Sequence, residues 1–202
     1  MNQKPEFIYN YVMRTYRAVN LNALWFLIAL NVVLFIITLL RPAETIAFLG
    51  LTPILLSKQP WTIISSMFIH GNLLHILFNM IGLYFLGSFL IRAVGDKSFL
   101  VVFFLGGLAG NILFTLLANP SSTGIGASGA IYALGGVLAI IVPRVPVLVF
   151  PLPVPIPLWI AIIIFLLLSF LPGIAWQAHI GGLILGLIAG LILKRRRRIS
   201  YF

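Results

Sequence analysis

Six long apolar runs restrict this chain to a membrane-spanning architecture. Hydrophobic residues make up 61% of its 202 residues and charged residues only 8%, whereas about a quarter of a soluble domain is charged. A helix needs about 20 predominantly apolar residues to cross a bilayer. We therefore predict an all-α polytopic membrane protein without a separate soluble domain. The predicted spans are residues 21–40, 70–92, 98–118, 126–142, 155–172 and 175–193.

The basic residues predict how these spans are oriented. Six spans place both chain ends on one side, and with a cytoplasmic N-terminus only Arg41 and Lys58 of the 13 Lys and Arg residues lie outside. This asymmetry follows the positive-inside rule. We expect a cytoplasmic segment at 1–20, a membrane domain at 21–193 and a basic cytoplasmic tail at 194–202 beside anionic lipid headgroups. The net charge of +10 then needs no nucleic-acid partner.

Polar side chains gather near the predicted outer ends of three spans. Ser128 lies within about one turn of the outer end of the fourth span, and His179 about one turn inside the sixth. His70, His75 and Asn79 are predicted to occupy the first turns of the second span. Ionisable groups inside a membrane are costly, which makes these residues functional candidates.

Spacing along the second span separates its polar residues. His75 and Asn79 are four residues apart and share one helix face. On a continuous helix His70 would point about 140° away from His75, because each residue turns the helix by about 100°, and would therefore have a different role. Asn72 lies near the helix start and is the better candidate for an N-cap.

Small residues recur at helical spacing on the fourth and sixth spans. Glycines follow His179 at intervals of four residues in the sixth span, and several small residues surround Ser128 in the fourth. Such surfaces allow two membrane helices to approach closely, so we expect them to bring Ser128 and His179 together. The sixth-span glycines are Gly182, Gly186 and Gly190, and the fourth-span residues include Gly126, Gly129, Ala133 and Gly136.

The three acidic residues limit the chemistry available to these groups. Glu6 and Asp96 are predicted to be cytoplasmic, and none of the three acids lies on a span. A serine hydrolase built on this chain would therefore use a Ser–His dyad. Tyr132 follows Ser128 by four residues on the same helix face and is the best candidate to orient the imidazole. Glu44 is on the outer side, and its approach to His179 stays open.

Each polar residue also has a structural explanation. A serine in a membrane helix is usually a small packing residue, and His179 could simply bond to a neighbouring carbonyl. The motif around Ser128 departs from the G-x-S-x-G nucleophile elbow because Ala130 replaces the last glycine. No H-E-x-x-H pattern is present and no carboxylate accompanies the three histidines on the spans. We therefore predict no metal site.

Three short motifs, in order along these spans, resemble one known family. G-x-S-G at residues 126–129 opens the fourth span, "HGNLLHILFN" opens the second, and "AHIGGLILG" lies in the sixth. Together they resemble the rhomboid intramembrane serine proteases over about residues 20–193. The resemblance implies a six-span rhomboid-like bundle that cleaves transmembrane segments of other proteins near the outer membrane face and needs no cofactor. The length of the chain favours a prokaryotic plasma membrane.

The resemblance also implies a role for each matching residue. Ser128 would be the nucleophile and His179 the general base, with Gly126 and Gly129 in the motif around the serine. The Ser128 N–H and the side chains of His75 and Asn79 would be the donors of the oxyanion hole. The Tyr132 ring would stack on His179, and His70 would have a structural role.

The sequence departs from the family pattern at two positions, and two alternative functions are weighed against this interpretation. Thr62 follows Trp61 where family members often carry a Trp-Arg pair, and Ile91 stands where a glutamate is common.

A rhomboid-like pseudoprotease would bind transmembrane segments without cutting them, but such proteins usually lose the serine or the histidine. A small transporter or channel would be expected to show intramembrane carboxylates or discontinuous helices in paired repeats.

Overall fold

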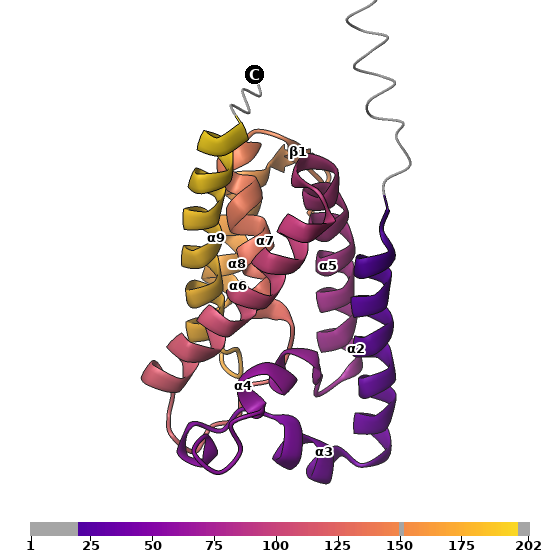
Figure 1. Cartoon of the computed structure of the whole chain (residues 1–202), viewed down its shortest axis with the longest axis vertical. Helices are drawn as coiled ribbons and strands as arrows, with labels where there is room; N and C mark the ends of the chain where they lie inside the picture. Colours follow the sequence, from indigo (N-terminus) through magenta and orange to yellow (C-terminus); the bar gives the residue numbers. More distant parts are fainter. Residues whose placement is uncertain (1–19, 150–151, 198–202) are drawn as a thin grey trace, which may run out of the picture.

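The computed structural model describes residues 20–149 and 152–197, and within them the chain is a bundle of helices (Figure 1). A helix lies in each of the six predicted apolar runs. Two short antiparallel strands, β1 (Pro146–Val147) and β2 (Ile156–Pro157), interrupt the helical pattern. The bundle helices are α2 (Asn22–Leu40), α5 (Leu73–Val94), α6 (Asp96–Leu117), α7 (Ser128–Ile141), α8 (Leu158–Leu168) and α9 (Trp176–Arg197).

The long connection between α2 and α5 folds into short helical pieces at one end of the bundle (Figure 1). Its backbone pairs with the segment that leads into α7, since Leu51 and Gly124 exchange hydrogen bonds of 3.0 and 2.8 Å. The connection therefore supports the chain just before Ser128. Its helical pieces are α3 (Pro42–Leu49), η1 (Pro53–Leu55), α4 (Thr62–Ser65) and η2 (Ser66–Phe68).

Two of the six helices, α7 and α8, are markedly shorter than the runs that predicted them. Among the described residues, α2, α5, α6 and α9 are long and apolar enough to cross a membrane. The 14 residues of α7 and the 11 of α8 rise only about 21 and 16 Å, at about 1.5 Å per residue. Prolines account for part of the shortening, because the residue before a proline disfavours helical geometry and proline itself lacks an N–H. Pro143 follows α7, and Pro153, Pro155 and Pro157 precede α8.

Two candidate residues lie outside the helices that were expected to contain them. The predicted second span starts at His70, but α5 begins at Leu73 because Asn72 caps it, its side chain accepting a hydrogen bond of 2.8 Å from the His75 N–H. Gly126 precedes α7 and has a φ of +116°, which favours glycine. At the other end of the chain, α9 continues to Arg197, so the first basic residues of the expected tail extend the sixth helix.

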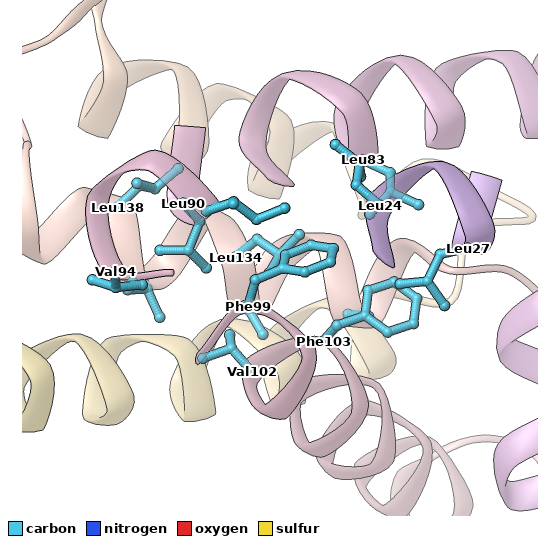
Figure 2. Close-up of a cluster of buried hydrophobic side chains, with 14 of the residues drawn as sticks. Leu24, Leu27, Leu83, Leu90, Val94, Phe99, Val102, Phe103, Leu134 and Leu138 are labelled. Carbon is cyan, nitrogen blue, oxygen red and sulfur yellow. The ribbon is translucent and has the colours of Figure 1, made fainter. Parts of the chain in front are cut away.

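The apolar core is built around α7. This helix is buried along most of its length, as expected for a helix that is apolar on all sides. Figure 2 shows Leu134 and Leu138 of α7 among buried side chains of α2, α5 and α6, with Phe99 and Phe103 of α6 at the centre. The first residue of α7, Ser128, is therefore held by the most buried helix of the bundle.

Glycines bring α9 against α7 at backbone distance. A Cβ atom on Gly182 would overlap the carbonyl of Gly129, and one on Gly186 would overlap the backbone of Ala133. The same close approach continues one turn further at Gly190. The predicted contact between the two small-residue surfaces is confirmed, and it holds His179, one turn before Gly182, beside the start of α7.

Candidate active site

The side chains of Ser128 and His179 meet between α7 and α9. The His179 Nε2 atom lies 2.8 Å from the Ser128 Oγ atom, a distance typical of a hydrogen bond. Ser128 is the first residue of α7 and is half-buried, while His179 is the fourth residue of α9 and is only 7% exposed. An imidazole in this position can accept the hydroxyl proton when its Nε2 carries no hydrogen.

The ring of Tyr132 stacks on the imidazole of His179. Their centroids are 4.4 Å apart and the planes are inclined by 21°. Tyr132 lies one turn after Ser128 on the same face of α7, so one helix face positions both the hydroxyl and the stacking ring. The stacked ring limits how the imidazole can turn.

Ser169 is a further member of the site, and the sequence reasoning missed it. It follows the last residue of α8 and is 2% exposed. Its Oγ atom lies 2.7 Å from His179 Nδ1 and 2.8 Å from the Tyr132 hydroxyl. A signal was available, because Ser169 is the only hydroxyl residue in the run 155–172 and lies at its predicted outer end.

A second side of the site is formed by His75 and Asn79 of α5 together with Gly126, which precedes α7. The His75 ring packs on Gly126, where a Cβ atom would come within 2.6 Å of His75 Nε2. The Asn79 amide Nδ2 donates to the backbone carbonyl of His75 at 2.8 Å, and since an amide nitrogen carries two hydrogens, one remains to donate elsewhere. Ser128 begins α7, and the N–H groups of a helix's first turn have no partner within that helix.

His70 does not point away from His75, so the helical-wheel expectation for it is wrong. The two rings are in edge-to-face contact with centroids 4.9 Å apart. The angle per residue of a helix does not apply to His70, because it lies before the Asn72 cap. Burial, reinforced by repulsion from His75, lowers the pKa of His70 to about 3. His70 is therefore a fully buried residue outside the helix, and its burial favours the neutral imidazole.

Glu44 is engaged away from the imidazole. It lies in the first turn of α3, where its carboxylate accepts a hydrogen bond of 3.2 Å from Arg41, and both side chains are largely exposed. Both ring nitrogens of His179 face serine hydroxyls, those of Ser128 and Ser169.

Within residues 20–149 and 152–197, no three His, Cys, Asp or Glu side chains form a group that could hold a metal ion.

This geometry defines a class: a helical membrane protein with a serine hydroxyl, an imidazole and candidate oxyanion donors at one end of its bundle. Comparison with known families gives the same class a name. A model of the Rhomboid domain matches residues 57–196. The chain belongs to the rhomboid family. Together with the apolar helices, this membership indicates a multi-pass integral membrane protein.

Relatives of known name come from plants, parasites and bacteria. The chain is 30% identical to RHOMBOID-like protein 4 of Arabidopsis thaliana over 154 residues, which are 76% of the chain and 39% of that protein. It is 31% identical to Rhomboid-like protease 3 of Toxoplasma gondii over 98 residues, 48% of the chain and 37% of that protein. It is 34% identical to Putative rhomboid protease YdcA of Bacillus subtilis (strain 168) over 77 residues, 38% of the chain and 39% of that protein. The chain thus spans less than half the length of each of these relatives.

Proposed function

We propose that this protein is an intramembrane serine endopeptidase that cleaves transmembrane segments of other membrane proteins. The observation that carries the proposal is the 2.8 Å contact between His179 Nε2 and Ser128 Oγ, held beneath the Tyr132 ring. Two relatives bear the name protease, which supports the assignment. The proposed catalytic pair is a Ser–His dyad, which is supported by the contacts of both His179 ring nitrogens with serine hydroxyls and by the contact of Glu44 with Arg41.

In the proposed reaction the dyad performs acyl transfer. His179 Nε2 takes the proton from Ser128 Oγ as the oxygen attacks the scissile carbonyl carbon, and the imidazolium then gives that proton to the leaving amine. Water then attacks the acyl carbon while His179 Nε2 takes one of its protons. As the bond between the acyl carbon and Ser128 Oγ breaks, the imidazolium returns that proton to Ser128 Oγ, and the product leaves as a carboxylic acid. The developing oxyanion accepts hydrogen bonds from the Ser128 N–H and from His75 and Asn79, and the positive end of the α7 dipole adds to this stabilisation.

The membrane arrangement is part of the same proposal. The chain crosses the plasma membrane six times, α7 and α8 doing so together with the non-helical segments beside them, with both chain ends in the cytoplasm and the site open to the outer side. Ser128, His75 and His179 lie in the first turns of α7, α5 and α9, which supports a site close to one membrane face. A substrate helix unwinds locally there, because an amide inside a helix already uses its carbonyl in a hydrogen bond. Membrane lipid surrounds the exposed apolar side chains.

The proposal is tested by incubating the purified protein, reconstituted in liposomes, with a single-span substrate. We expect two fragments whose masses place the cut within the transmembrane segment, near the outer face. A fluorophosphonate should block the reaction. Stable binding of the substrate without any fragment would instead establish a pseudoprotease and refute the proposal.

Asn79 is expected to contribute through the oxyanion. Replacing Asn79 by alanine removes one donor and should lower the cleavage rate by about 10²–10³-fold, as is typical for a single oxyanion-hole donor. Thermal stability in detergent should change little, because the hydrogen bond that Asn79 Nδ2 donates to the His75 carbonyl lies within α5. Initial rates at saturating substrate measure the effect. A full rate in the variant would remove Asn79 from the oxyanion hole.

Glu44 is expected to be dispensable. The variant Glu44→Gln keeps the shape of the side chain and removes its charge, and we expect cleavage within about twofold of the wild type because an exposed ion pair contributes little to stability. The same cleavage assay measures it. Activity near zero in Glu44→Gln would show that the dyad depends on this carboxylate, and the dyad mechanism would be abandoned.

A further inference from the structure

We infer that Ser169 is a positioning residue that fixes the tautomer of His179, so that its Nε2 atom is free to accept the Ser128 proton. A neutral hydroxyl would thus perform the orienting part of the task that a carboxylate performs in Ser-His-Asp proteases. The hydrogen-bond assignment stands on geometry alone, while its catalytic consequence rests on the proposed function.

Three polar atoms surround the Ser169 Oγ atom within hydrogen-bond distance. They are His179 Nδ1 at 2.7 Å, the Tyr132 hydroxyl at 2.8 Å and the Phe165 carbonyl oxygen at 3.0 Å. The Phe165 oxygen belongs to the last turn of α8 and can only accept. Ser169 has one proton to donate and can accept two hydrogen bonds.

The count of donors selects one arrangement of protons. If Ser169 donates to the Phe165 carbonyl, it accepts from the Tyr132 hydroxyl and from a protonated His179 Nδ1. Neutral imidazole has one N–H, so His179 Nε2 is then bare and accepts the Ser128 proton. All three contacts of Ser169 Oγ and the Ser128 contact are hydrogen bonds in this arrangement.

The opposite tautomer satisfies fewer contacts. With the proton on His179 Nε2, Ser169 must donate to Nδ1, and its contact with the Phe165 carbonyl is no longer a hydrogen bond. The ring would also donate to Ser128, which is the wrong direction for activating a nucleophile. Ser169 is 2% exposed and His179 is 7% exposed, so water has little access to compensate. The buried network therefore favours the tautomer that catalysis needs.

The main test is nitrogen NMR of the histidines, which does not depend on activity. The chain has only three histidines, so ¹⁵N-histidine protein in liposomes gives few signals, and a His179→Asn spectrum identifies those of His179. We expect wild-type His179 to carry its proton on Nδ1. In Ser169→Ala we expect a mixture of both tautomers, and in Ser169→Thr, which keeps the hydroxyl, we expect the wild-type pattern.

A matched control separates this role from general packing. Thr38→Val removes another buried hydroxyl, one that donates to the Leu34 carbonyl of its own helix at 2.8 Å, and it should leave the His179 signals unchanged. A wild-type His179 protonated on Nε2 would overturn the inference. So would an unchanged tautomer ratio in Ser169→Ala.

Cleavage kinetics test the catalytic consequence separately. Ser169→Ala should lower kcat by about 10- to 100-fold, less than the 10²–10⁴-fold that a general base contributes, with little change in KM. Ser169→Thr should recover most of the rate. Wild-type kcat in Ser169→Ala would refute the catalytic role of Ser169 and leave the proposed protease function standing. Absence of cleavage in the wild type would refute the protease function, while the NMR result would still decide the tautomer.

Discussion

Replacing Ser128 by alanine is expected to abolish cleavage of a single-span substrate, with a loss of at least about 10³-fold in kcat. Removing the nucleophile of other serine proteases costs up to about 10⁶-fold, and the residual rate comes from the oxyanion hole and binding. In this protein the loss follows because Ser128 Oγ is the hydroxyl that His179 Nε2 contacts. Fragment formation over time, measured at saturating substrate, gives the ratio.

The variant should remain folded, which makes the loss interpretable. The His179 ring keeps its contacts with Ser169 and Tyr132 when the Ser128 hydroxyl is removed, so the melting temperature in detergent should stay close to the wild-type value. Ser88→Ala is the matched control, because that partly buried hydroxyl donates to the carbonyl of Phe85 at 3.1 Å and lies outside the site. Cleavage that survives in Ser128→Ala would end the proposal for a serine protease.

The second large effect is expected from adding one methyl group at Gly182. A Cβ atom there would overlap the Gly129 carbonyl, which belongs to the backbone of α7 and cannot turn aside. Gly182→Ala should therefore push α9 away from α7. Overpacking of this kind costs about 1–3 kcal/mol in the free energy of unfolding. Because a shift of about 1 Å at a catalytic group can cost about 10²-fold in rate, activity should fall together with stability.

Gly82→Ala provides the matched control for this prediction. It makes the same substitution in α5, where the new Cβ atom would meet only side-chain atoms of Ile131, the nearer being Cγ2 at 3.2 Å. Thermal unfolding in detergent and the cleavage rate are measured for both variants. A Gly182→Ala protein as stable and active as Gly82→Ala would show that the close approach of α7 and α9 is not required.

The sequence predicted the helices better than their ends. Hydropathy located a helix in every apolar run, since apolar runs of this length are favourable only as hydrogen-bonded helices inside a membrane. Hydropathy overestimated the lengths of α7 and α8, because a proline can stand at the end of an apolar run without ending the run, although it ends the helix. It also extended the second span to His70, where the Asn72 cap, visible in the sequence, is the actual start of α5.

The site was predictable where helical spacing alone positions the residues. Ser128 and Tyr132 share a face of α7, and the glycine repeat after His179 predicted that α9 meets α7. The contact between Ser128 and His179 could therefore be anticipated. The contact between His70 and His75 could not, because it depends on a non-helical turn. Ser169 was missed because a serine at a helix end has an ordinary local explanation, a bond to a preceding carbonyl. Only the tertiary arrangement places it on His179 Nδ1.

The most direct test of the central claim is to locate the covalent adduct of a fluorophosphonate on the wild-type protein. The reagent loses fluoride and forms an ester with an activated serine, and peptide mapping by mass spectrometry identifies the modified residue. We expect one adduct per chain, on Ser128, under conditions in which Ser88 stays unmodified. An adduct on another residue, or continued cleavage by protein whose Ser128 is fully modified, would contradict the account.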